Sequence, residues 1–388
     1  MRSILKIILK ILAKRVLVRY RPIVIGITGS VGKTMTKEAI YAVLHRNFFV
    51  RKTADNNNNE FGVPMTVLGM SPTIAGLAKS FWLAYGPKVR QYPNVLILEL
   101  AADRPGDIRY LTEMVRPEIA VVSAIGPTPV HVEFYASSEA VAEEKSAILT
   151  FARTTVLNYD DPMVRAMRDD RAVMIGFDSA ADIWASDTAY YLDQEAIAGL
   201  SFKIHHGESF VPVRIPGIFA LHQIYALLAA IAVGLRMQMN LVEITHAFER
   251  MELPAHRMSV LHGVRGSIIL DDTYNASPLS MEGALRTLRD FPSKHKRIAI
   301  LGDMKELGKY SAEAHQKTGI LAHAAADTVI TLGELAQDMG GSHVVSIEEA
   351  IAKAQTLIQE GDVVLIKGSR SMQMEKIVEA LAVSPKKP

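Results

Sequence analysis

Short runs of apolar, often β-branched residues recur along this chain, and helical patterns separate most of them. Each run has about the length of a buried strand, and continuous apolar strands are typical of parallel sheets covered on both faces. Strands that alternate with helices predict a mostly parallel α/β architecture. The clearest strand patterns are residues 23–27, 95–100, 119–125, 267–270, 297–301, 328–332 and 363–366.

The pattern changes in the middle of the chain. Between residues 173 and 213, short strands and turns such as 201–205 and 210–215 replace the strand–helix alternation. Two apolar helical patterns follow, and the alternation resumes near His256. We therefore expect three units: an N-terminal helix of residues 1–22, a central domain of residues 23–253 and a C-terminal domain of residues 254–388.

The first 22 residues are apolar and basic, and the first acidic residue of the chain is Glu38. Lys6, Lys10 and Lys14 fall four residues apart, so a helix places them on one face, with isoleucines and leucines over most of the rest. Such a helix is typical of proteins that lie on an anionic membrane surface, but it is too short and too charged for a membrane span. Packing on the core with the lysines in solvent explains the pattern equally well.

Composition narrows the class of protein. A chain of 388 residues is long enough for two or three domains. Its 49% hydrophobic and 22% charged residues are typical of a soluble globular protein, and a net charge of +2 argues against nucleic-acid binding through bulk electrostatics. The absence of cysteine excludes disulfides, thiolate zinc sites and cysteine nucleophiles, and fits a cytoplasmic location.

The stretch G-I-T-G-S-V-G-K-T joins the first strand to a helix. Backbone N–H groups of such a turn point at phosphate oxygens, the lysine supplies a cation, and the threonine hydroxyl is placed to ligate Mg²⁺. Ile27 stands where the strict phosphate-loop spacing has glycine, but G-K-T at a strand-to-helix junction favours a nucleotide site over a chance turn. The predicted nucleotide contacts in this loop are Gly29, Ser30, Val31, Gly32, Lys33 and Thr34.

One carboxylate, Glu99, lies near the end of the strand pattern 95–100. Burying a lone carboxylate is costly without a cation, and strand ends beside a phosphate loop are where magnesium-binding carboxylates sit. We therefore favour a metal ligand over a structural ion pair. The pattern alone interprets Glu143, Glu144 and Lys145 as a solvated helix face, and the asparagines at residues 56–59 as a solvated turn.

Seven separate stretches carry a family resemblance: residues 26–34, 56–64, 131–134, 157–162, 271–278, 301–308 and 367–370. Together they resemble the Mur ligases, the ATP-dependent amide-forming enzymes of peptidoglycan precursor synthesis. Within that family the resemblance is nearest to the branch that adds D-alanyl-D-alanine to a UDP-N-acetylmuramoyl-tripeptide. It implies a phosphate-loop NTPase-like central domain and a Rossmann-like C-terminal domain that binds the amine substrate.

The resemblance also implies a reaction. An acceptor carboxylate attacks the γ-phosphate of ATP to give an acyl phosphate, and the amine then displaces phosphate. Both steps bring negatively charged groups close together, so catalysis should depend on cations and on the positioning of the substrates. Thr34, Glu99 and His131 would hold Mg²⁺, and Lys145 matches a lysine that is carbamylated in the family. The catalytic residues implied in this way are Lys33, Glu99, His131, Lys145 and Arg257.

Further contacts follow from the same resemblance. Arg257 would reach the phosphates once the two domains close. Other nucleotide contacts would be His222, Gln223, Asp272, Tyr274 and Asn275, and substrate contacts would be Asn58, Asn59, Asp303, Glu306, Lys367 and Arg370. This chain departs from the family pattern at Gln223, where asparagine is usual, and between Gly126 and His131, where the path is longer.

The largest departure lies before the phosphate loop, where residues 1–22 stand in place of the family's UDP-binding domain. We therefore expect a cytoplasmic monomer that holds its acceptor differently, with a peripheral contact to the inner membrane surface through residues 1–22. One alternative is a ligase of the same chemistry for a lipid-linked or polyglutamate acceptor. The other is a catalytically silent, membrane-associated nucleotide-binding protein, against which the joint presence of Lys33, Glu99, Lys145 and Arg257 argues.

Overall fold

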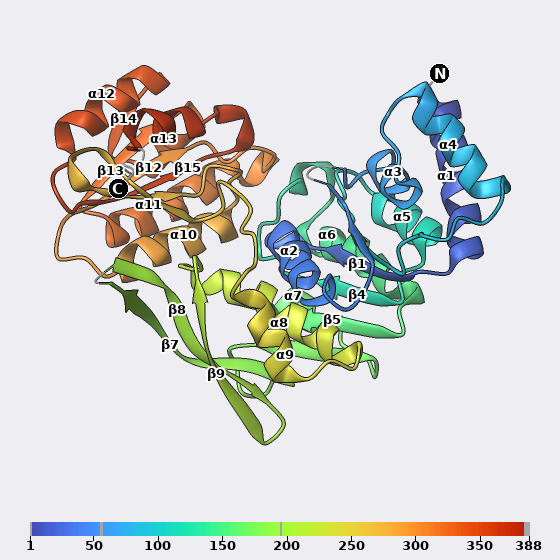
Figure 1. Ribbon diagram of the computed structural model, residues 1–388. Coiled ribbons are helices and arrows are strands. Elements are labelled where there is room, and N and C mark those ends of the chain that lie inside the picture. The colour runs from blue at the N-terminus through green and yellow to red at the C-terminus, as the bar shows by residue number, and fades with distance from the viewer. Residues whose placement is uncertain (1, 55–56, 195, 384–388) are drawn as a thin grey trace.

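Two sheets, each covered by helices on both faces, organise the residues described by this computed structural model, 2–54, 57–194 and 196–383 (Figure 1). The first sheet has the strand order β2-β3-β1-β4-β5-β6-β7-β8-β9 and is parallel from β2 to β7. Its strands are β1 (Ile23–Thr28), β2 (Val50–Lys52), β3 (Val95–Glu99), β4 (Ile119–Val122), β5 (Thr154–Asn158), β6 (Ala172–Gly176), β7 (Ile183–Asp193), β8 (Ala196–His206) and β9 (Ser209–Pro216).

Alternating side chains divide the apolar residues of this sheet between two cores. In β1, Ile25 and Ile27 enter one core, whereas Val24 enters the core on the opposite face. The first core is covered by α2 (Lys33–Leu44), α8 (Leu221–Arg236) and α9 (Leu241–Phe248). The second is covered by α1 (Arg2–Tyr20), α3 (Gly62–Leu68), α4 (Ile74–Tyr85), α5 (Asp107–Val115), α6 (Ser138–Ser146) and α7 (Pro162–Arg165), with the short turn η2 (Ala147–Phe151). A further short turn, η1 (Val132–Phe134), lies between β4 and α6.

The segment of residues 173–213 does not form a set of short strands. Strands β7 and β8 are 11 residues long and pair antiparallel with each other, as β8 does with β9. Apolar residues of these strands, such as Phe202 and Ile215, belong to the same core as β1. The prediction of short strands was wrong here because polar residues alternate with apolar ones along a half-exposed ribbon, which hides its length in the sequence.

Helix α1 packs on the first body with one face. Leu9, Leu12, Ala13 and Val16 are buried in the core that also holds Val24 and Leu96. Packing on the core is thus confirmed for one face of the helix, and we propose to count α1 with the central domain of residues 23–253.

The second sheet has the strand order β10-β11-β15-β12-β13-β14, and only β10 and β11 pair antiparallel. Its strands are β10 (Ser259–His262), β11 (Ile268–Asp271), β12 (Arg297–Gly302), β13 (Thr328–Leu332), β14 (Ser342–Val344) and β15 (Val363–Lys367). One face carries α10 (Pro278–Asp290) and α11 (Ser311–Ala325), and the other carries α12 (Ile347–Leu357) and α13 (Glu375–Leu381). Short 3₁₀ turns are η3 (Val264–Gly266), η4 (Gly308–Tyr310), η5 (Leu335–Met339) and η6 (Arg370–Met372).

The predicted fold class is confirmed: both sheets are mostly parallel and lie in two α/β bodies. The two bodies meet along the carboxyl ends of their strands, where the chemistry of α/β proteins is usually placed. In the first sheet this edge carries the phosphate loop after β1. In the second it carries the residues after β11, β12 and β15, whose ends are in register.

Candidate active site

The phosphate loop curls tightly between β1 and α2. Gly29 has a φ of +145°, and a Cβ atom there would lie 2.1 Å from the Ser123 hydroxyl, so only glycine fits. Gly32 precedes α2 with a φ of +89°. The first N–H groups of a helix have no partner within the helix, so the start of α2 presents donors and a positive dipole end to an anion.

Two of the predicted loop donors have another partner. The N–H groups of Ser30 and Val31 donate to the carbonyl oxygen of Ala124, which follows β4. The sequence did not show this bond because Ala124 lies far along the chain. The Ser30 hydroxyl oxygen is buried and has no hydrogen-bond partner within the described residues. A buried polar atom beside a helix start is what a phosphate oxygen would satisfy.

Lys33 folds back over this loop and donates to the carbonyl oxygens of Gly29, at 2.8 Å, and Ser30, at 3.4 Å. Burial lowers the pKa of the Lys33 ammonium, Arg257 lowers it further, and the negative charge of Glu99 opposes both effects. The ammonium therefore lies within the field of the two groups predicted to handle phosphate and metal.

Glu99, at the end of β3, is buried and accepts two hydrogen bonds. The Thr34 hydroxyl donates to it at 3.2 Å, and the Asn58 side chain donates at 3.1 Å. Its neighbours are thus a hydroxyl and an amide, and no ion pair to it is found among the described residues. Asn59 instead accepts from the N–H groups of Phe61 and Gly62 at the start of α3. Asn56 lies outside the described residues.

Lys145 is almost fully buried, so its interpretation as a surface cation is wrong. Burial lowers the pKa of its amine to about 7, with a further decrease from the positive charge of Lys33. Glu144 and Asp103 act in the opposite direction. Glu144 is fixed by accepting from the N–H groups of Gly106 and Ile108 at the start of α5. Lys145 is thus a partly neutral amine close to the phosphate loop.

His131 contacts one carboxylate from each of the two bodies. Its Nδ1 lies 3.0 Å from the carboxylate of Glu306, in the C-terminal body, and its Nε2 lies 3.6 Å from Asp103. The contact with His131 lowers the pKa of the Glu306 carboxyl. No group of three or more His, Asp or Glu side chains suited to a metal occurs in the part of the chain that is described. The structure therefore brings Thr34 and Glu99 together but does not add His131 to them.

Arg257 joins the two bodies. Its guanidinium donates to the Thr34 hydroxyl at 3.0 Å, across 223 positions of sequence. The same guanidinium stacks 3.9 Å from the ring centre of Tyr274, and Arg370 approaches that ring from 5.6 Å. Arg257 therefore contacts the phosphate loop in this structure, and its predicted contact with the phosphates stays a prediction.

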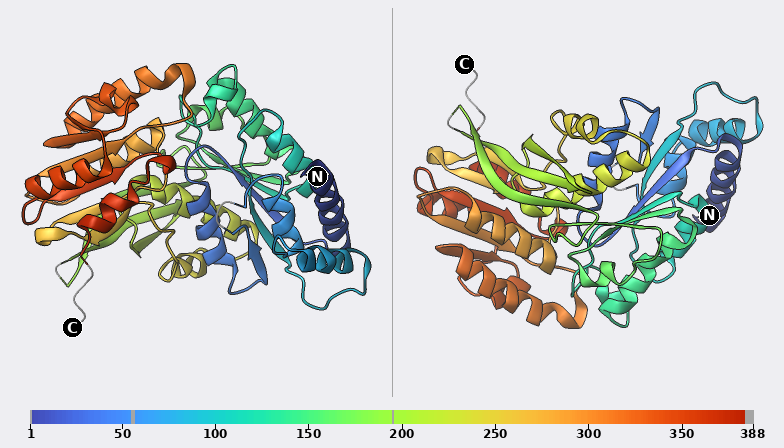
Figure 2. Two further views of the ribbon diagram at one scale, coloured as in Figure 1. Left: turned by 90° about the horizontal axis from the view of Figure 1, so that it is seen from above. Right: turned by 90° about the horizontal axis from the view of Figure 1, so that it is seen from below.

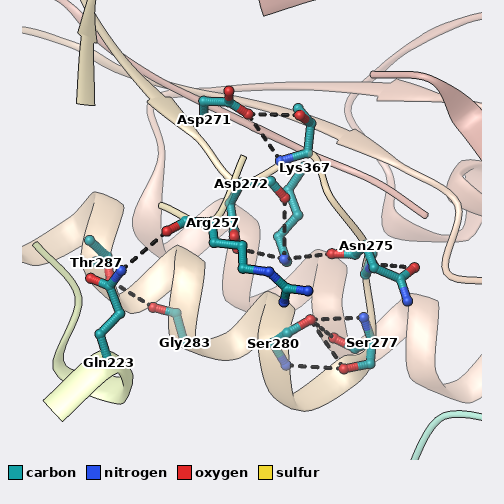
Figure 3. Close-up of polar contacts among 12 residues, drawn as sticks. Gln223, Arg257, Asp271, Asp272, Asn275, Ser277, Ser280, Gly283, Thr287 and Lys367 are labelled. Carbon is teal, nitrogen blue, oxygen red and sulfur yellow. Dashed lines mark hydrogen bonds and ion pairs between the residues drawn. The ribbon is translucent and has the colours of Figure 1, made fainter. Parts of the chain in front are cut away.

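At the start of α8, Gln223 is buried and His222 is half-buried. The Gln223 oxygen accepts from the N–H groups of Phe219 and Ala220, and its amide donates to the backbone carbonyl of Arg257 at 3.1 Å (Figure 3). Three hydrogen bonds to the protein thus fix the Gln223 side chain, and its predicted nucleotide contact stays a prediction. Burial lowers the pKa of His222, whose Nδ1 has no hydrogen-bond partner within the described residues.

Lys367 also has protein partners. Its ammonium lies between Asp272, whose carboxylate it meets at 2.5 Å, and the carbonyl oxygen of Asn275, at 2.8 Å (Figure 3). The lysine and the aspartate are both buried, so this pair ties the end of β15 to the turn after β11. Lys367 thus supports the turn that presents Tyr274, and the N–H of Arg370 reaches the Asn275 side chain at 3.4 Å.

Asp303, after β12, supports the same edge. Its buried carboxylate accepts from Lys305 at 2.6 Å and from the N–H of Ala336 at 2.8 Å, and its carbonyl oxygen accepts from Ser369. Among the predicted substrate residues, Glu306 and Arg370 are the ones with carboxylate or guanidinium atoms still partly in solvent.

Sequence reasoning missed Asp103 and Tyr135. Asp103 influences Lys33, Lys145 and His131, and it follows β3 by four residues, so the strand-end argument used for Glu99 could have found it. The Tyr135 hydroxyl is buried and has no hydrogen-bond partner among the described residues; burial raises its pKa. No local pattern marks that tyrosine.

A phosphate loop at the edge of one α/β body, reached by an arginine from a second, defines a two-domain nucleotide-dependent enzyme. The sequence model of the Mur ligase middle domain matches residues 27–234, and that of the Mur ligase glutamate ligase domain matches residues 256–370. The chain belongs to the Mur ligase family and is an ATP-dependent ligase.

Curated relatives extend over most of the chain. The UDP-N-acetylmuramoyl-tripeptide–D-alanyl-D-alanine ligase of Mycobacterium tuberculosis is 30% identical over 395 residues, which cover 92% of this chain and 72% of that protein. The Bacillus subtilis ligase of the same name is 28% identical over 391 residues, covering 96% and 79%.

One solved structure has a similar fold over most of its length. The MurF ligase from Thermotoga maritima in complex with ADP has a TM-score of 0.81 and 27% identity, covering 96% of this chain and 82% of that one.

Proposed function

We propose that this chain joins D-alanyl-D-alanine to the free carboxylate of a UDP-N-acetylmuramoyl-tripeptide, or of a closely related acceptor, with cleavage of ATP to ADP and phosphate. The observation that carries the proposal is the contact of Arg257 with Thr34, because it brings a cation from the second body onto the phosphate loop of the first. The relatives that match over most of their length are named for this reaction.

The donor set at the phosphate loop fits Mg²⁺. Hard cations take oxygen ligands, and the Thr34 hydroxyl and Glu99 carboxylate are in direct contact, with the Asn58 amide beside them. A magnesium ion held by Thr34 and Glu99 would neutralise phosphate charge. The ligand role predicted for His131 stays a prediction.

The protein's own cations then have distinct tasks. Lys33 and Arg257 approach the loop from opposite bodies, so together they would hold the transferred phosphoryl group and the acyl phosphate that it forms with the acceptor. The amine of Lys145, with its pKa near 7, is reactive enough to take up CO₂ as a carbamate, which would place a carboxylate beside Lys33.

The amine substrate would enter at the edge of the second sheet. We propose that Arg370 and Tyr274 contact it, and that Lys367 and Asp303 hold their turns in place, because the polar atoms of these two residues are already occupied. His222, Asp272 and Asn275 remain proposed neighbours of the nucleotide. A monomeric state and a peripheral membrane contact through residues 1–22 also remain proposals.

The test is phosphate release from Mg·ATP by the purified full chain, with each substrate omitted in turn. Release that requires both UDP-N-acetylmuramoyl-tripeptide and D-alanyl-D-alanine supports the proposal. Release with D-alanyl-D-alanine and a lipid-linked carboxylate, or with glutamate and a polyglutamate acceptor, but none with the nucleotide tripeptide, would replace the proposed acceptor. An Arg257→Ala variant serves as the control, since it should lower release by about 100-fold or more with any true substrate pair.

A further inference from the structure

Helix α1 has a second apolar face, which the fold leaves in water. At about 100° per residue this face lies opposite the buried one. Its members are 53 to 73% exposed, in contrast to the nearly inaccessible residues that face the core. They are Ile4, Ile7, Ile11 and Val18.

Helix α4 continues this surface with aromatic residues. Ile74 is 91% exposed, and Phe81, Trp82 and Tyr85 are about half exposed on the same side of the helix. The Arg15 guanidinium lies 5.2 Å from the ring centre of Tyr85, and Arg19 donates to the carbonyl oxygens at the end of α4, so the two helices adjoin at their exposed sides. We call these eight apolar residues of α1 and α4 the outer face.

The outer face lies at one end of the molecule. In Figures 1 and 2, α1 and α4 run side by side at the end of the first body that is farthest from the second sheet. Docking there would leave the C-terminal body free to approach the phosphate loop. The surface is thus outside the candidate active site.

The charges that border the outer face are all of one sign. Residues 1–37 and 61–98, which contain both helices, include no Asp or Glu. Lys14 and Arg15 are exposed on either side of the apolar stripe of α1, and Lys79 and Lys88 are exposed on or just after α4. Among the described residues, a carboxylate approaches at the flank toward α5, where Glu60 lies 4.0 Å from Lys6.

We propose that the outer face docks on an anionic lipid bilayer, with α1 and α4 lying parallel to the membrane plane. Apolar side chains and a tryptophan between rows of lysine and arginine are the pattern of an interfacial helix. No helix in the described part of the chain is long and apolar enough to cross a membrane. A second copy fits less well, because a two-fold dimer would bring this positively charged surface against itself. The proposal is independent of the ligase reaction.

The test is flotation of the full chain with vesicles of phosphatidylcholine, with and without about one third of phosphatidylglycerol. We expect binding to the anionic vesicles, and a loss of about tenfold or more in partitioning for Ile7→Glu with Ile11→Glu, and for Lys14→Glu with Arg15→Glu. The matched control is Ile320→Glu with Val345→Glu, which changes two even more exposed apolar residues of the C-terminal body and should bind like the unmodified chain. All six positions are exposed, so each variant should melt at the same temperature as the parent.

Trp82 gives a second measurement. The chain has two tryptophans, and replacing Trp184 by Phe leaves Trp82 as the only one. Its fluorescence should shift to the blue when anionic vesicles are added and should be quenched by lipids with brominated acyl chains. Absence of anionic binding, equal binding to neutral vesicles, or an unshifted Trp82 would overturn the proposal. So would a concentration-dependent dimer that the Ile7 and Ile11 changes abolish while lipid binding stays absent.

Discussion

The sharpest prediction concerns the amine of Lys145. Burial lowers its pKa from 10.5 to about 7. At pH 8 about nine tenths of such an amine is neutral, against about 0.3% for a lysine with the unshifted pKa, so the protein raises the reactive fraction about 300-fold. Between pH 8 and pH 6 the neutral fraction should fall about tenfold. Carbamate formation requires the neutral amine, so it should follow this titration.

The assay is ¹³C NMR of the protein under a constant concentration of dissolved ¹³CO₂ from pH 6 to pH 9. We expect one carbamate resonance whose intensity rises with a midpoint near pH 7 and which is absent in Lys145→Met. Phosphate release should rise over the same range. A midpoint near that of free lysine, or a resonance that survives in the Met variant, would refute the reasoning from burial.

The lowered pKa of Lys145 also affects the free energy of unfolding. An ammonium whose pKa is depressed by folding destabilises the folded state at low pH, and the cost fades as pH rises from the folded pKa to the unfolded one. Without CO₂, Lys145→Met should therefore be more stable than the parent by a few kcal/mol at pH 6, with the difference shrinking between about pH 7 and pH 10. Urea denaturation at several pH values measures it.

Three further changes test other parts of the site. Arg257→Ala removes the contact with Thr34, and we expect kcat/KM for ATP to fall by about 100-fold or more with little change in melting temperature, whereas Arg257→Lys should recover only part of the loss. Gly29→Ala would place a methyl group 2.1 Å from the Ser123 hydroxyl, so nucleotide binding measured by calorimetry should be lost, and adding Ser123→Ala should restore part of it. Gln223→Ala leaves two N–H groups and a carbonyl unpaired and should cost about 2–3 kcal/mol in urea denaturation; an unchanged stability would contradict the assigned bonds.

The sequence was sufficient to predict the two α/β bodies, because continuous apolar strands and the G-K-T turn are local signals. The strand of residues 328–332 is found with its predicted limits, and the turn opens α2 as expected. Glu99 could be placed by its position at a strand end. The state of Lys145 could not be predicted from its neighbours, because its burial depends on how α6 packs against distant elements.

Side chains that combine polar and structural roles were the hardest to predict. The motif at Lys367 was recognised, but its pairing with Asp272 depends on two strands meeting across 95 positions of sequence. One partner of His131, Glu306, likewise comes from the other body. Motif spacing gives the residues of such a site, and only the folded arrangement gives their contacts.

The bond from Gln223 to the carbonyl of Arg257 has a mechanical consequence. His256 and Met258, on either side of Arg257, both have positive φ angles, near 59°, so the chain turns sharply at the point that Gln223 holds. If the C-terminal body rotates about this point, Arg257 lies near the rotation axis and moves little. Arg370 and Glu306 lie farther from the axis and move through a larger distance. Arg257 would then stay beside the nucleotide while the C-terminal body opens and closes the amine site. Distances between spectroscopic labels on the two bodies, measured with and without ATP, would reveal such a rotation.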